Sequence, residues 1–124
     1  MDRVFVIIGS LLMFIAVGAG AFGAHGLNSY FAQYPDLKET FETAVRYQMV
    51  HGLALFIVAW LSSKWPGSLT IWAGYLFLAG VILFSGSLYV LVFTRIPWLG
   101  AITPVGGLAF LAGWLCLAFA AWHN

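Results

Sequence analysis

Long apolar segments alternate with short polar ones along the chain, and each apolar segment has the length of a membrane-spanning helix. The pattern predicts spans at about residues 4–24, 44–62, 69–93 and 104–122. Such segments suffice because ~20 apolar residues, at about 1.5 Å of rise each, cross the ~30 Å hydrocarbon core. Short connections place consecutive spans side by side in opposite directions. We therefore expect an all-α integral membrane four-helix bundle with antiparallel up-down connectivity, a single transmembrane domain over residues 1–124.

Capping patterns predict where two of these helices begin. Residues 36–43 form the amphipathic, extramembrane start of the second span, with Asp36 as the expected cap and Glu39 as its capping-box-like partner. Thr103 is the expected cap of the fourth span, because the proline that follows it suits the first helical position. Residues 99–102 are expected to approach that span as non-helical chain.

Composition restricts the class of protein. Of the 124 residues, 63% are hydrophobic and 7% charged, and the mean hydropathy is +0.99. A soluble domain carries about 25% charged residues, so this chain has too few to cover a water-soluble core. The net charge of +1 provides no basic patch for nucleic acid. The expected surroundings are the lipid bilayer, and the lone Cys116 is expected to be a buried, inert thiol.

Polar residues inside the predicted spans gather in one leaflet. Antiparallel helices bring together the end of the first span, the start of the second, the end of the third and the start of the fourth. The polar residues on these segments that are candidates for ligand binding are His25, Tyr47, Gln48, His51 and Ser85. Unpartnered polar groups are costly in hydrocarbon, so these side chains should point inward. They form either a ligand site or a structural hydrogen-bond network between helices, and the sequence leaves both readings open.

Charged and catalytic residues add little to this picture. Glu42 and Arg46 are four residues apart in the order that favours an ion pair, and we expect this pair at the rim of the site. His25 and His51 lack the spacing or the nearby carboxylate of a metal site, so no metal ion is expected. No nucleotide-binding or hydrolase motif is present, and hence no catalytic residue, cofactor or enzymatic activity is expected.

Several stretches of the chain resemble a known family, the "domain of unknown function 423" group of small bacterial membrane proteins. The stretches are GAFGAHGL (20–27), TAVRYQMVHGLAL (43–55), LAGVILFSGSLY (78–89) and LGAITPVGGLAFLAGW (99–114). The resemblance covers 49 of the 124 residues and parts of all four spans. It implies a four-helix, multi-pass protein of the cytoplasmic (inner) membrane, and it supplies neither a substrate nor a functional residue.

Two hypotheses about function follow. The first is a non-enzymatic bundle that binds a hydrophobic or amphipathic small molecule, or a partner membrane subunit, in its polar half. The second is a small oligomeric transporter or channel, in which any proton coupling rests on His51 because no acidic residue lies within the apolar spans. Faces of small residues favour homo-oligomers. Two basic residues at one end against three at the other favour an outside N-terminus.

Overall fold

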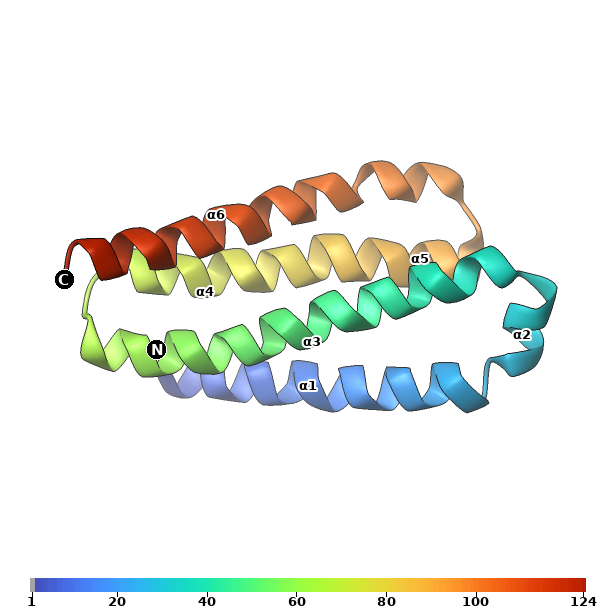
Figure 1. Ribbon diagram of the computed structural model, residues 1–124, viewed down its shortest axis with the longest axis horizontal. Helices are drawn as coiled ribbons and strands as arrows, with labels where there is room; N and C mark the ends of the chain where they lie inside the picture. Colours follow the sequence, from blue (N-terminus) through green and yellow to red (C-terminus); the bar gives the residue numbers. More distant parts are fainter. Residues whose placement is uncertain (1) are drawn as a thin grey trace.

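The computed structural model describes residues 2–124 as an all-helical bundle (Figure 1). Its elements are α1 (Asp2–His25), α2 (Asn28–Gln33), α3 (Pro35–Lys64), α4 (Ser68–Gly80), the π-helix η1 (Val81–Ser85), α5 (Gly86–Thr94), the 3₁₀-helix η2 (Pro97–Ala101) and α6 (Thr103–Trp122). Four helical segments are long and apolar enough to cross a membrane: α1, α3, the continuous run of α4, η1 and α5, and η2 with α6. The expected all-α fold with four spans is therefore confirmed.

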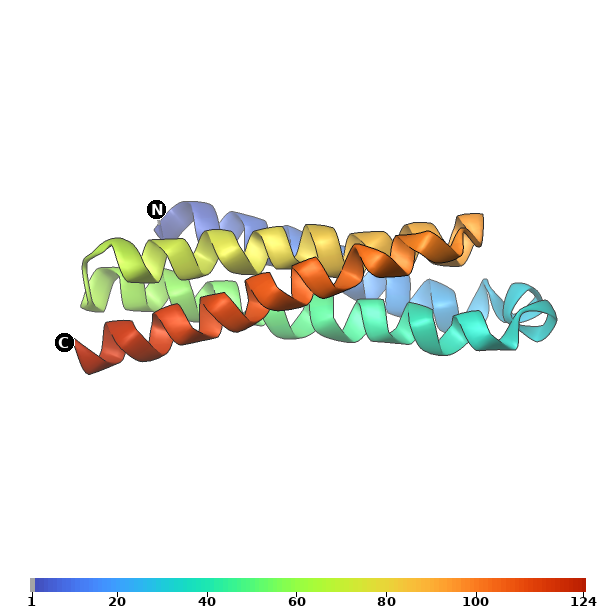
Figure 2. The same cartoon turned by 90° about the horizontal axis from the view of Figure 1, so that it is seen from above.

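The spans lie lengthwise in the bundle, and each runs opposite to the one before it (Figure 1). The start of α1 and the end of α6 consequently lie at the same end, while α2 lies at the other end. Helix α1 packs along α3, and α6 packs along α4 (Figures 1 and 2). Large apolar side chains such as Phe14, Ile82, Leu108 and Leu111 are exposed on the outside. An apolar outer surface is what a bundle surrounded by lipid requires.

Aromatic rings seated over glycines bring the helices together. A Cβ atom built on Gly74 would lie 2.3 Å from the ring of Phe5, and one on Gly113 would lie 2.6 Å from the ring of Phe77. The same relationship joins Gly80 to Phe110 and Gly23 to Phe41. Small residues permit this close packing, which is the main attraction between helices in lipid. The rings of Phe5 and Phe77 are fully buried as a result.

The third span contains a π-helical turn, Val81–Ser85, that the hydrophobic pattern does not reveal. Helix α6 packs closely against this turn. A Cβ atom on Gly106 would lie 2.4 Å from the backbone nitrogen of Phe84. All residues of the turn are compatible with an α-helix, so the local sequence carries no signal for the wider turn. Single π turns inside helices are frequent at functional sites.

The expected helix caps are wrong. Pro35 occupies the first turn of α3 and Tyr34 precedes it, so Asp36 lies inside the helix and no side chain caps this end. Thr103 likewise lies within α6, and its hydroxyl group contacts Ser87 instead of a backbone N–H at the helix start. The chain before α6 also differs from the expectation, because residues 97–101 form the 3₁₀-helix η2.

Candidate functional site

Gln48 is the centre of a hydrogen-bond network within the bundle. Its Nε2 donates to the carbonyl oxygen of Leu12 on α1 at 2.8 Å, and its Oε1 accepts from the hydroxyl of Tyr89 on α5 at 2.7 Å. The Gln48 side chain is only 3% exposed. Because a buried amide is costly unless its polar atoms are paired, these bonds fix α3 against two neighbouring helices.

Two serines form further hydrogen bonds that hold the third span. The hydroxyl of Ser85 donates to the carbonyl oxygen of Ala44 on α3 at 2.7 Å. Ser87 donates to the carbonyl of Phe84 at 2.9 Å, and its oxygen lies 2.6 Å from the hydroxyl of Thr103 on α6. Since the Ser87 proton is used by the carbonyl, Thr103 is the donor in the second bond. The third span is thereby held to both α3 and α6.

His51 is held by both of its ring nitrogens. Nδ1 lies 2.9 Å from the carbonyl oxygen of Tyr47, and Nε2 lies 3.1 Å from the indole nitrogen of Trp114 on α6. A carbonyl oxygen only accepts and an indole N–H only donates, so the proton of the neutral imidazole is on Nδ1. The ring also stacks on Phe110 with 3.6 Å between centroids. His51 is therefore a fully paired histidine between α3 and α6.

An open aromatic groove lies beside His51, between α3 and α6. We call it the α3–α6 groove, and its volume is about 520 Å³. It is lined by Tyr47, His51, Phe84, Pro104, Gly107, Leu108, Phe110, Leu111 and Trp114. Two of the predicted ligand-binding residues, Tyr47 and His51, thus face one hollow.

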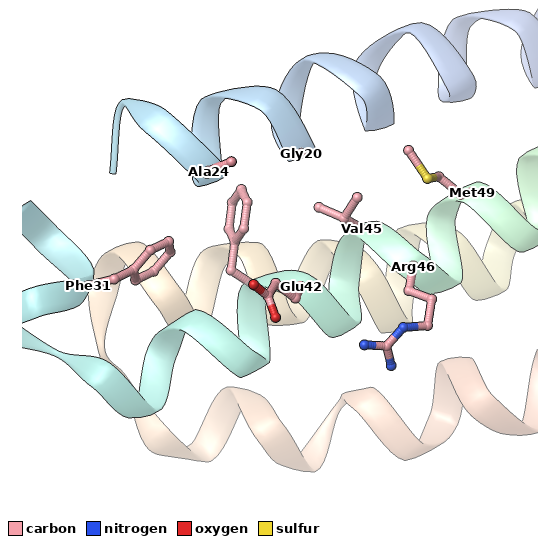
Figure 3. Close-up of a pocket in the computed structure, with 9 residues that line it drawn as sticks. Gly20, Ala24, Phe31, Glu42, Val45, Arg46 and Met49 are labelled. Atoms are coloured by element: carbon pink, nitrogen blue, oxygen red, sulfur yellow. The ribbon is translucent and has the colours of Figure 1, made fainter. Parts of the chain in front are cut away.

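A second hollow of about 280 Å³ lies between α1, α2 and α3 (Figure 3), and we call it the α1–α3 pocket. Its lining consists of Gly20, Gly23, Ala24, Phe31, Phe41, Glu42, Val45, Arg46 and Met49. The space exists because α1 presents only small residues here. The nearest side-chain atom to a Cβ built on Gly20 would be a methyl carbon of Val45, at 3.6 Å. The pocket is apolar except for two charged side chains at its rim.

Those charged side chains are Glu42 and Arg46, one helical turn apart on α3. Figure 3 shows Val45 and Met49 pointing toward α1, whereas the guanidinium group of Arg46 extends away from it. Both charged residues are exposed. Within residues 2–124 they form no ion pair with each other or with another side chain. The expected rim ion pair is thus absent from the described chain, because exposed charges gain little from pairing when each is solvated.

The predicted site residues do not meet in a single cavity. Tyr47 and His51 line the α3–α6 groove, while Gln48 and Ser85 are engaged in bonds between helices. His25 is exposed at the end of α1. Among residues 2–124 no three side chains of metal-ligating type lie together.

Sequence reasoning missed two parts of these hollows. One is the role of the small residues on α1, which were interpreted as a face for close helix packing and which line the α1–α3 pocket. The other is Trp114, which lies in the middle of a span. Tryptophans of membrane proteins concentrate at the two membrane interfaces, so a mid-span tryptophan was a signal that its N–H has a buried partner.

Comparison with known proteins identifies the family. A family model described as "Protein of unknown function (DUF423)" matches residues 19–107. The chain belongs to the DUF423 family. The match includes α2, α3, the whole third span and the start of α6, and hence most residues around both hollows. The family description assigns no activity to its members.

Relatives of this DUF423 chain are named as membrane proteins. The UPF0382 membrane protein YwdK of Bacillus subtilis is 49% identical over 122 residues, covering 96% of each chain. UPF0382 membrane protein SERP0230 of Staphylococcus epidermidis is 45% identical over 118 residues, covering 95% of this chain and 94% of its own. No solved structure matches. Together with the four apolar spans, these relatives establish an integral membrane protein in a lipid bilayer.

Proposed function

We propose that this DUF423 protein is a non-enzymatic protein of the cytoplasmic membrane that binds an amphipathic small molecule in the α1–α3 pocket. The observation that carries the proposal is the combination of an apolar interior with two unpaired charges at the rim. The side chains of Phe31, Phe41 and Val45 offer an apolar surface, and Glu42 and Arg46 offer polar contacts. A molecule with an apolar part and a polar part matches both.

The depth of the pocket supports an amphipathic ligand. Its α1 lining ends at Ala24, directly before His25 ends the helix. Gly20 lies five residues from that end, which corresponds to about 7.5 Å along the helix axis. The pocket therefore lies near one end of the spans, where hydrocarbon gives way to headgroups. A lipid-like molecule presents the same change from apolar to polar at this depth.

The internal network supports the pocket by holding its walls. Gln48 lies one turn from Val45 and bonds to Leu12 on α1, so it keeps α1 and α3 in register below the pocket. Ser85 bonds α3 from the other side. We assign Gln48 and Ser85 a positioning role toward the ligand. His51 joins α3 to α6 outside this pocket, with Tyr47 beside it, and His25 lies at the end of α1.

The surroundings of His51 favour binding over proton-linked transport, the alternative hypothesis. Both of its ring nitrogens are engaged, and its ring is stacked on Phe110. A proton carrier has to exchange partners, whereas this ring is tied to two helices. Formation of a homo-oligomer, or binding of a partner subunit, stays a prediction.

Filling the pocket tests the proposal. Ala24 lines the pocket, whereas Ala21, one turn earlier on α1 and also exposed, does not. We expect an amphiphile to co-purify with the wild-type protein in native mass spectrometry, to be lost from Ala24→Phe and to be kept by Ala21→Phe. Equal retention by both variants would overturn the proposal. Circular dichroism and size-exclusion chromatography check that both variants are folded.

A further inference from the structure

We infer that the α1–α3 pocket recognises a zwitterionic phospholipid, one whose headgroup carries a phosphate and a primary ammonium. Arg46, whose exposed side chain would turn toward α1 from its orientation in Figure 3, would bind the phosphate, and Glu42 would bind the ammonium. The inference rests on the proposed function, since it names the chemical class of the amphiphile. Three properties of the two charged residues at the rim of the pocket support it. They have opposite signs, they follow each other in a fixed order along α3, and neither is engaged in an ion pair within the described chain.

The order of the charges along α3 matches the order of charges in such a lipid. Helix α3 begins at Pro35, near the aqueous end, and runs into the membrane. Glu42 is therefore nearer to water than Arg46, by about 6 Å for four residues of helix. In a phospholipid the phosphate adjoins the glycerol and the acyl chains, and the ammonium lies farther out. A deep cation and a shallow anion are complementary to that arrangement.

Both charged groups are available for a ligand. Neither Glu42 nor Arg46 forms an ion pair within residues 2–124, and both side chains are exposed. An ionised partner makes a hydrogen bond roughly twice as strong as a neutral one does, and a guanidinium group binds phosphate in a bidentate manner. A carboxylate accepts hydrogen bonds, and a primary ammonium supplies three donors together with a positive charge.

The same pair of charges selects against other amphiphiles. A lipid whose phosphate carries only a neutral polyol would offer Glu42 hydroxyl donors but no positive charge, and would bring a phosphate close to the carboxylate. A cationic amphiphile without phosphate would be repelled by Arg46. Selectivity of this kind comes from the unfavourable contact of the wrong ligand as much as from the favourable contact of the right one.

The apolar lining sets how much of the lipid enters. Gly20, Val45 and Met49 continue the pocket inward from the charged rim. A hollow of about 280 Å³ is too small for a whole phospholipid. It accommodates the junction between headgroup and tails, and the rest of the acyl chains lies against the exposed apolar face of α1.

Lipid titration of the purified full-length protein tests the inference. The probes are phosphatidylethanolamine and phosphatidylglycerol with identical acyl chains, with binding read by native mass spectrometry. We expect the wild-type protein to prefer phosphatidylethanolamine by about tenfold, as one charge-assisted contact provides. Glu42→Gln should reduce this preference to about one. The matched control is Glu39→Gln, which removes the same charge from α3 outside the pocket and should keep the preference.

The cationic half of the site has its own variant and control. Arg46→Gln should weaken binding of both lipids by about tenfold, because both carry the phosphate. Lys38→Gln, outside the pocket on the same helix, should leave both affinities unchanged. All four substituted residues are exposed, so the folded state should tolerate each change.

The outcomes separate this inference from the proposed function. Equal affinity of the wild-type protein for the two lipids, or an equal effect of Glu42→Gln and Glu39→Gln, overturns the zwitterion inference. The proposed function stands in that case if Ala24→Phe still abolishes amphiphile binding. If Ala24→Phe binds lipid as the wild-type protein does, the proposed function fails and the inference fails with it.

Discussion

The indole N–H of Trp114 donates to Nε2 of His51 across 3.1 Å, joining residues 63 positions apart in the chain. This bond and the bond from Nδ1 to the carbonyl of Tyr47 use both nitrogens of the imidazole. The histidine therefore acts first as a connection between α3 and α6. Its location at the edge of the α3–α6 groove follows from that connection.

Removing His51 should destabilise the bundle and leave lipid binding in the α1–α3 pocket intact. His51→Ala loses two hydrogen bonds and the stacking on Phe110, and we expect a loss of about 2 kcal/mol of unfolding free energy. Titration with a denaturing detergent, followed by circular dichroism, measures this change. Loss of the bound amphiphile from folded His51→Ala protein would instead place the histidine in a binding site.

Trp114 should account for part of that effect. Trp114→Phe keeps an aromatic ring and removes the N–H donor, so we expect a loss of about 1 kcal/mol. The exposed Trp72 serves as the control, and Trp72→Phe should change the unfolding free energy by less than about 0.5 kcal/mol. Similar losses in the two variants would show that the bond to His51 contributes nothing measurable.

The contact between Gln48 and Tyr89 should appear as a coupling energy. Gln48→Leu and Tyr89→Phe each remove one partner of the 2.7 Å hydrogen bond. The double variant should lose about 1 kcal/mol less stability than the sum of the single variants, as expected for a side-chain bond between membrane helices. Strict additivity in the double-mutant cycle would contradict the network described above.

Gly106 should tolerate no side chain. A Cβ atom there would lie 2.4 Å from a backbone nitrogen in η1, which cannot move without separating α6 from the third span. We expect Gly106→Ala to lower the unfolding free energy by about 1–3 kcal/mol. The neighbouring Gly107 has its nearest contact at 4.0 Å. Gly107→Ala should be neutral or stabilising, because alanine is the better helix former. The reverse ranking would refute the close contact.

Gly23 should control the shape of the α1–α3 pocket. A Cβ atom at this position would lie 2.4 Å from the ring of Phe41, so the ring has to shift to make room for it. Because Phe41 lines the pocket, a displaced ring should take up its free space. We expect Gly23→Ala to remain folded and to retain less of the co-purifying amphiphile. Gly18→Ala is the control, since no atom lies within 4 Å of its added Cβ. Equal retention by the two variants would argue against this role.

The positions of Tyr47 and Gln48 show where reasoning from spacing reaches its limit. Both residues were expected to point inward together with His51. Adjacent residues of a helix point about 100° apart. In a bundle, an angle of this size is enough for two adjacent side chains to face two different helices. Gln48 accordingly bonds toward α1 and α5, while Tyr47 faces the groove beside α6. The spacing of residues along one helix does not reveal which neighbouring helix packs against each of its sides.

The existence of four helices follows from local chemistry. A backbone in hydrocarbon has to satisfy its own hydrogen bonds, so an apolar run of sufficient length is a helix whatever surrounds it. The order of the spans and the concentration of polar residues in one half of the bundle also follow from the local sequence. Each can be read from the printed chain without knowledge of any contact.

The two hollows, the π turn and the pairing of His51 with Trp114 have a different origin. They depend on the rotation and separation of whole helices, which are set by how rings such as Phe41 and Phe110 fit over glycines on other segments. Such contacts join residues far apart in the chain, and many rotations of an apolar helix have similar energies until all its neighbours are in place. Packing in three dimensions is therefore what selects the pocket from the several arrangements that the hydrophobic pattern allows.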